Sequence, residues 1–252
     1  MSNYSFDVQA LLAPPDILCA KRVLCIQPHP DDNEIGMGGT MAYLADAGCE
    51  IHVLTITDGA QGNRDHTASL EQTIKTRREE TEKAGRHLGV KHFYYLNEGD
   101  GTLNDIVGLS EKIAGVIRQA QPEVIFCPDP WLSYEGHYDH IVTGRAASNA
   151  FHMSHRRHFP QSEFAPWDAK AIAYYFTAQP NTVVDITPFM EKKFEAIALH
   201  DSQMTPETLA MYRIYFGMKA AELAQNCGFQ LGEGFKALSA LHTHCFVDAI
   251  HI

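Results

Sequence analysis

The chain has 252 residues, of which 45% are hydrophobic, so it is long enough to bury a substantial core. Its formal net charge is -11, from 20 Lys and Arg against 31 Asp and Glu. This balance argues against binding to nucleic acid or to an anionic membrane surface, because phosphate groups need a basic face. A small molecule that is neutral or weakly charged is the expected partner.

The sequence predicts neither export nor membrane insertion. Residues 1–16 lack the basic and apolar regions of a signal peptide, and no run approaches the roughly 18 consecutive apolar residues of a membrane span. The six cysteines include no CxxC pair, which favours reduced thiols over a disulfide framework or a thiolate zinc site. We therefore expect a cytoplasmic protein.

Strand-like and helix-like segments alternate along the first part of the chain. Apolar runs predict strands at 23–26, 50–57, 92–96 and 123–127. Apolar residues at helical spacing predict helices at 40–47, 70–88, 106–120 and from about 141. This βαβα order is typical of a parallel sheet that is covered by helices on both faces.

The last hundred residues are less regular. Strands are expected at 171–177 and 183–186, and Thr187-Pro188 and Thr205-Pro206 predict helix starts, the second helix ending near Cys227. No repeat, low-complexity segment or linker-like composition interrupts the chain. We expect a single α/β domain over residues 1–252, a Rossmann-like three-layer sandwich with a mostly parallel central sheet.

A polar motif follows the first predicted strand. Residues 27–40 begin Gln-Pro-His-Pro-Asp-Asp-Asn-Glu and are expected to form the loop before the first helix. His29 and the carboxylates of Asp31, Asp32 and Glu34 form a ligand set that suits a divalent metal such as zinc. Taken alone, the stretch could also be a solvated polar turn.

A second polar cluster, His137, Asp139 and His140, follows the fourth predicted strand. In a doubly wound sheet of order 3-2-1-4-5, strands one and four are neighbours, and ligands bind between their carboxyl ends. We therefore expect the two clusters to meet there. The remaining histidines need no such role; His152, His155 and His158 fall at helical spacing and predict a polar helix face.

The combined clusters contain the groups that a zinc hydrolase needs. Such sites use three His or carboxylate ligands and leave the fourth position to water, whose pKa the metal lowers toward about 7. His29, Asp32 and one histidine of the second cluster could hold the metal. A free carboxylate would take the proton, and the other histidine could stabilise the oxyanion or protonate the leaving amine.

Arg77 lies on the apolar stripe of the predicted helix at 70–88, where an unpaired charge is costly. Glu80 is one helical turn away, and Asp100 follows the third predicted strand. The sequence leaves two interpretations open. Arg77 either forms an internal ion pair or lines a pocket and binds the hydroxyl groups of a polar substrate.

The ordered motifs of the chain resemble the PIG-L (LmbE-like) family of zinc-dependent N-deacetylases, over about residues 22 to 145. The matching segments are His29-Pro30-Asp31-Asp32 with Ile35-Gly36-x-Gly38-Gly39, Arg77-x-x-Glu80, Asp129-Pro-Trp-x-x-Tyr-Glu and His137-x-Asp139-His140. The loop DPWLSYEGHYDH is most similar to that of the diacetylchitobiose deacetylases. The GlcNAc-malate deacetylases are the nearest alternative.

The resemblance implies a role for each matching residue. One zinc ion per subunit would be held by His29, Asp32 and His140. Asp31 would be the general base, and His137, oriented by Asp139, would stabilise the oxyanion. The substrate-binding residues would be Arg77, Asp100 and His244, the last contributed to the site of a neighbouring subunit. A homo-oligomer, trimer or hexamer, is also implied, whereas residues 150–180 match no family motif and are expected to shape the substrate pocket.

The expected activity is removal of the N-acetyl group from a GlcNAc-containing small sugar, either GlcNAc or a diacetylchitobiose-like molecule. A GlcNAc-malate deacetylase of the bacillithiol pathway and a sugar-thiol conjugate amidase are the enzymatic alternatives. A nucleotide-binding Rossmann module is disfavoured because G-x-G-x-x-G is absent and the acidic loop would repel pyrophosphate. In a purely structural metal site, four protein ligands normally close the shell, and Asp31 and His137 would have no purpose.

Overall fold

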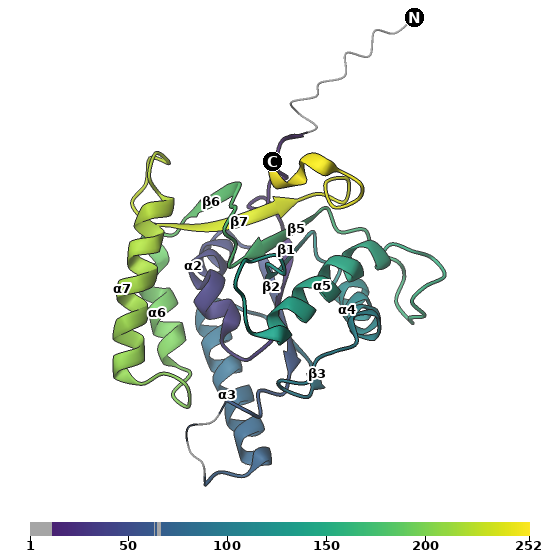
Figure 1. Ribbon diagram of the computed structural model, residues 1–252. Helices are drawn as coiled ribbons and strands as arrows, with labels where there is room; N and C mark the ends of the chain where they lie inside the picture. Colours follow the sequence, from purple (N-terminus) through teal and green to yellow (C-terminus); the bar gives the residue numbers. More distant parts are fainter. Residues whose placement is uncertain (1–11, 63, 65–66) are drawn as a thin grey trace, which may run out of the picture.

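The structure, a computed structural model, describes residues 12–62, 64 and 67–252. Its centre is a seven-stranded sheet in the order β3-β2-β1-β4-β5-β7-β6 (Figure 1). The strands are β1 (Arg22–Gln27), β2 (Glu50–Thr57), β3 (His92–Glu98), β4 (Val124–Pro128), β5 (Ala171–Tyr175), β6 (Thr182–Asp185) and β7 (Gly232–Leu238). Strands β1 to β5 pair in parallel, which confirms the predicted 3-2-1-4-5 order.

Helices cover both faces of the sheet (Figure 1). They are α2 (Asp32–Asp46), α3 (Leu70–Leu88), α4 (Ile106–Ala120), α5 (Tyr138–Met153), α6 (Met190–Ala198) and α7 (Pro206–Leu223). One face carries α2, α3, α6 and α7, and the other carries α4 and α5, so two separate apolar cores form. This arrangement confirms the predicted α/β three-layer sandwich. None of the described helices is long and apolar enough to cross a membrane.

The local sequence explains the central elements. Val23, Leu24, Cys25 and Ile26 of β1 are all fully buried, as expected for a central parallel strand that has helices on both faces. Helix α3 starts at a hydroxyl cap, where the side chain of Ser69 accepts a hydrogen bond from the backbone N–H of Gln72. It ends at Gly89, whose φ of 99° lies in the left-handed region.

Helix α2 begins at Asp32, two turns earlier than predicted, and is kinked at Met37. The glycines of this segment serve close packing within the helix instead of forming a loop. A Cβ atom on Gly39 would lie 2.8 Å from the side chain of Ile186, and one on Gly36 would lie 2.5 Å from that of Tyr175. The sequence pattern alone does not distinguish glycines that allow close helix packing from glycines of a loop, so the predicted start of this helix is too late.

Two further elements differ from the prediction. Helix α5 ends at Met153, so His155 and His158 lie beyond it and the predicted polar helix face is wrong. Strand β7 is not predicted by the sequence pattern, because its segment contains two glycines and the charged Glu233 and Lys236. Both charged residues are buried. Glu233 can lie inside because its carboxylate accepts hydrogen bonds from Lys193 and from the backbone of α2.

Candidate metal centre and active site

The first polar motif lies at the carboxyl end of β1. β1 pairs in parallel with β2 on one side and β4 on the other, and the chain leaves β1 and β4 toward helices on opposite faces of the sheet. This is the switch point at which open α/β sheets bind ligands. His29 lies in the connection from β1 to α2, His137 caps α5, and His140 lies in the first turn of that helix.

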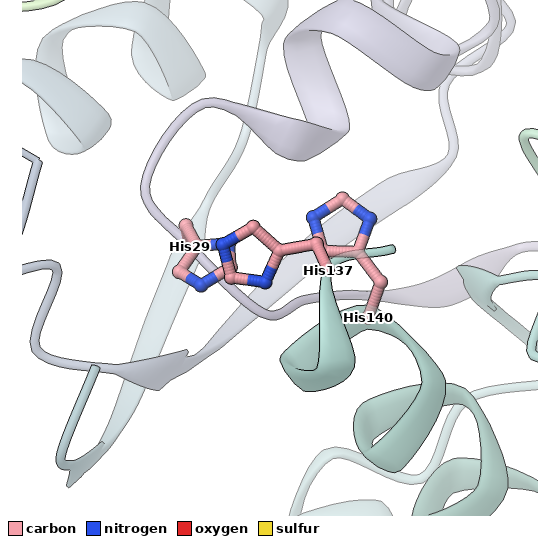
Figure 2. Close-up of side chains that lie close together, drawn as sticks. All are labelled: His29, His137 and His140. Carbon is pink, nitrogen blue, oxygen red and sulfur yellow. The ribbon is translucent and has the colours of Figure 1, made fainter. Parts of the chain in front are cut away.

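Three histidines from the two motifs come together at this point (Figure 2). The ring centroids of His29 and His137 are 4.4 Å apart, those of His137 and His140 are 5.1 Å apart, and those of His29 and His140 are 5.4 Å apart. One ring nitrogen from each lies within 4.8 Å of the other two. The arrangement brings three potential metal ligands to one place.

The carboxylate of Asp32 lies between two of these rings. Its Oδ2 is 3.2 Å from Nδ1 of His29, and its Oδ1 is 3.3 Å from Nε2 of His140. Burial alone would raise the pKa of Asp32, but His140 and His29 together lower it well below its ordinary value. The structure thus brings together His29, Asp32 and His140, the predicted ligand set, with an ionised carboxylate in the middle.

The other side of the His29 ring faces two more carboxylates. Its Nε2 lies 3.2 Å from Oδ2 of Asp139 and 3.4 Å from Oδ1 of Asp100. Asp139 also accepts a hydrogen bond of 2.7 Å from the backbone N–H of Gly101, and Asp100 accepts one of 2.9 Å from that of Gln61. The carboxylate of Asp139 therefore contacts the His29 ring, whereas the resemblance implies that it orients His137.

The charge balance around His29 fits a bound cation. Burial would lower the pKa of its ring, but hydrogen bonds to Asp100, Asp139 and Asp32 raise it to about 12. The neighbouring carboxylates therefore hold a proton on His29. Since a metal ligand must be deprotonated, a divalent ion could replace that proton and balance more of the negative charge. The donor set of imidazoles and carboxylates suits zinc.

Asp31 has an unusual backbone and an unusual charge environment. Its φ of 126° lies in a region that non-glycine residues rarely adopt, a strain of order 1–3 kcal/mol that typically occurs at functional sites. Burial, opposed by the guanidinium of Arg77 and reinforced by Asp32, raises the pKa of the Asp31 carboxyl to about 6. This carboxylate lies beside the predicted metal ligands and has the pKa of a group that can exchange protons near neutral pH.

Arg77 holds Asp31 in place. Its Nη2 lies 3.3 Å from Oδ2 of Asp31 and donates a 2.6 Å hydrogen bond to the carbonyl of Pro30, and Nη1 donates to that of Gly59. The internal ion pair that the sequence left open is present, but its partner is Asp31. Glu80 instead accepts two hydrogen bonds from Ser202.

Glu135 is a site residue that the sequence reasoning did not assign. Its Oε1 accepts a 2.7 Å hydrogen bond from the backbone N–H of His137, and its Oε2 lies 3.4 Å from Nδ1 of His140. Its position inside the motif Tyr-Glu-Gly-His was the available signal.

His137 is exposed to solvent, but its ring is partly shielded by its neighbours. This partial burial and the nearby His29 and His140 lower the pKa of His137, so its ring is neutral near pH 7.

A buried pair behind the site was also missed. Glu34, in the first turn of α2, and His200, which follows α6, are both buried, and their Oε2 and Nε2 atoms are 3.7 Å apart. Glu34 and Asp31 raise the pKa of His200 against the effect of burial. No local pattern pairs these residues, because they are far apart in the sequence.

His244 lies away from the cluster within one copy of the chain. Its ring is 6.2 Å from that of His152, in the last turn of α5, whereas His140 is in the first. A separation of twelve positions spans roughly 18 Å along a helix. A cavity of about 690 Å³ lies in this region and is lined by residues that include His152 and Trp131. The predicted role of His244 at a neighbouring subunit's site stays a prediction.

The fold and the cluster together resemble the metal centre of a hydrolase, with His and Asp side chains that could bind a metal at a switch point and a separate carboxylate beside them. The family model described as "PIG-L: GlcNAc-PI de-N-acetylase" matches residues 24–151. The chain therefore belongs to the PIG-L family of deacetylases. It is a hydrolase, and the predicted family is confirmed.

Individual relatives match most of the chain. It is 34% identical to diacetylchitobiose deacetylase of Thermococcus kodakarensis, over 96% of this chain and 95% of that one. It is 28% identical to a probable N-acetyl-alpha-D-glucosaminyl L-malate deacetylase of Bacillus cereus, over 73% and 84%. The solved N,N'-diacetylchitobiose deacetylase of Pyrococcus horikoshii superposes with a TM-score of 0.87 and 36% identity, covering 93% of this chain and 90% of that one.

Proposed function

We propose that this chain removes the acetyl group from an N-acetylglucosamine unit of a small sugar such as GlcNAc or diacetylchitobiose, releasing acetate and a free amine. The observation that carries the proposal is the pairing of the His29, Asp32 and His140 donor set with Asp31, a carboxylate free to exchange a proton. The similarity to two diacetylchitobiose deacetylases supports this class of substrate.

His29, Asp32 and His140 would hold one zinc ion. When bound, zinc lowers the pKa of a water molecule and polarises the substrate carbonyl. Asp139 acts on this set through His29, since its carboxylate contacts the Nε2 side of that ring. Such a contact fixes the orientation of a ligand ring, and its loss typically costs 10- to 100-fold in metal affinity or activity.

Asp31 is the general base of the proposed reaction. Its pKa of about 6 leaves it ionised at neutral pH, so it can take the proton of the attacking water. The protonated carboxyl can then give that proton to the amine that leaves. Arg77 is a positioning residue, because its guanidinium holds the carboxylate and the carbonyl of Pro30 together.

His137 stabilises the oxyanion that forms when the amide carbonyl is attacked. Its ring is neutral near pH 7, lies 4.4 Å from that of His29 and is exposed to solvent, so an N–H group can reach a bound substrate. The backbone of His137 is held by Glu135. Sugar-hydroxyl binding by Asp100, participation of His244 across subunits and a trimeric or hexameric state are further parts of the proposal.

The test is release of free amine from GlcNAc, diacetylchitobiose and GlcNAc-malate, with metal content measured on the same samples and a chelator-treated control. We expect turnover of GlcNAc or diacetylchitobiose that is lost with the chelator. Turnover of GlcNAc-malate alone would favour the second candidate function, which the Bacillus cereus relative suggests. Stoichiometric zinc with no turnover of any of the three would contradict the proposed substrate class.

A further inference from the structure

A second group of side chains that could bind a metal lies at the amino ends of two strands, on the opposite side of the sheet from the carboxyl ends that carry His29. Glu50 and His52 are on β2, and His92 is the first residue of β3. One ligand atom from each lies within 4.8 Å of the other two. All three residues are at the amino ends of their strands. The residues His29, Asp32, His137 and His140, here called the His29 cluster, lie at the carboxyl ends of the parallel strands.

The pairing of the strands places these side chains on one face. His52 and His92 are direct partners in the parallel register of β2 and β3. Glu50 precedes His52 by two residues, and side chains two apart on a strand point to the same face. The group is therefore fixed by two neighbouring strands of the sheet and does not depend on the conformation of a loop.

The three ligand atoms are close enough that one ion could contact all of them after only small movements of the side chains. Oε1 of Glu50 is 2.7 Å from Nε2 of His52 and 3.9 Å from Nε2 of His92. The two imidazole rings have centroids 4.4 Å apart and planes that differ by 30°. His52 is buried and His92 is exposed, so an ion could enter from solvent and be held against the sheet.

Tyr94 supports the orientation of His52. Its hydroxyl lies 3.2 Å from Nδ1 of His52. At 2.7 Å from Glu50, the Nε2 atom of His52 donates its hydrogen to that carboxylate when no ion is bound. A hydroxyl can accept as well as donate, so when an ion replaces that proton Tyr94 can accept from an Nδ1–H group and leave the Nε2 lone pair to the ion. Metal-ligating histidines almost always have such a partner on the second ring nitrogen.

We propose that Glu50, His52 and His92 bind a divalent transition-metal ion, with Zn²⁺ as the probe of choice, at a site separate from the His29 cluster. Two imidazoles and a carboxylate are ligands that suit zinc, with water in the fourth position. The bound ion joins the edge strand β3 to β2. Because its three ligands come from two paired strands, the ion is expected to stabilise that pairing.

Arg22 sets the affinity of this site. Its Nε donates a 3.0 Å hydrogen bond to Oε1 of Glu50, so its positive charge competes with a metal ion for the same carboxylate. The Nη1 group of Arg22 also donates to backbone carbonyls at the end of α4. Replacing the guanidinium with an apolar side chain, Arg22→Met, is expected to tighten zinc binding at Glu50.

The experiment is equilibrium dialysis of the full chain against buffered Zn²⁺, followed by determination of zinc per chain. The matched control is His87→Ala, which removes an exposed histidine whose Nε2 lies 2.9 Å from Oε2 of a single carboxylate, Glu195. We expect two zinc equivalents for the unmodified chain and for His87→Ala, one for His92→Ala, and tighter binding of the second equivalent for Arg22→Met.

The same measurement can overturn the proposal. Binding of only one equivalent by the unmodified chain would contradict it, and so would two equivalents bound by His92→Ala. If His92→Ala does not fold, Glu50→Gln serves as the second variant, because it keeps the size of the side chain and removes its charge. Two zinc equivalents bound by Glu50→Gln with unchanged affinity would then contradict the site.

Discussion

The two ends of the parallel strands, here called the carboxyl edge and the amino edge of the sheet, carry clusters with the same ligand types but different surroundings. At the carboxyl edge, His29, Asp32 and His140 come from connections and helix starts, and further buried carboxylates face them. At the amino edge, His52 and His92 come from paired strands and share one carboxylate that already has an arginine partner. Histidine and carboxylate ligands alone therefore do not make a catalytic site.

What separates the two clusters is the group next to the ligands. Asp31 is partly buried, strained and held by Arg77, and its pKa is raised to about 6. At the amino edge the carboxylate of Glu50 is 40% exposed, and its pKa is lowered by its hydrogen bond to His52. Charges are screened there, whereas at the carboxyl edge they interact strongly.

The largest effect is expected from His140→Ala, which removes a proposed ligand from the carboxyl edge. We expect loss of the zinc equivalent bound there and a fall in kcat/KM on the order of 10³-fold or more. Zinc per chain and amine release are measured on the same sample. If the variant keeps that zinc equivalent, His140 is not a ligand.

Asp31→Asn should remove the base and leave the metal in place. We expect kcat to fall by about 10²- to 10⁴-fold, the usual contribution of a general base, while zinc content stays unchanged. Since the side chain keeps its size, circular dichroism serves as the control for folding. Full activity in a zinc-loaded sample of this variant would contradict the role of Asp31.

Arg77→Met tests the positioning of that base. Arg77 lowers the pKa of Asp31, so its removal should raise that pKa, and Asp31 must be ionised to accept a proton. Activity is therefore lost as pH falls through the pKa of Asp31, and we expect this acid limb of kcat/KM to move to higher pH in the variant. An acid limb at the same pH as in the unmodified chain would show that Arg77 does not act through Asp31.

His92→Ala should have the smallest effect on catalysis. The residue lies at the opposite edge of the sheet, so we expect amine release to change by less than about twofold, as for distant and independent sites. The kinetics are compared at a zinc concentration that saturates the unmodified chain. A large loss of kcat would mean that the two clusters are coupled.

The sequence predicts the parts of this molecule that depend on local pattern. The apolar run of β1 and the motifs around His29 and His140 lead to the strand order and to the meeting of the two clusters. Strand β7 cannot be predicted in this way, because its buried Glu233 is stabilised by Lys193, which is forty residues away in the chain. The same holds for the pairing of Arg77 with Asp31, since nothing in the helical pattern of α3 points to that partner.

The roles of nearby residues are also set by tertiary contacts. The resemblance places Asp139 behind His137, but the loop after β3 and the start of α5 direct its carboxylate to His29. The cluster of Glu50, His52 and His92 has no sequence motif, because its residues become neighbours only through the register of two strands. Geometry, and not residue type, separates the two proposed metal sites.

The most direct test of this account is a zinc titration of the chelator-treated chain, with amine release from diacetylchitobiose measured at each step in the unmodified chain, His140→Ala and His92→Ala. We expect activity to rise with the zinc equivalent that His140→Ala lacks and to be independent of the one that His92→Ala lacks. Activity that follows the His92-dependent equivalent, or that persists in the absence of zinc, would contradict it.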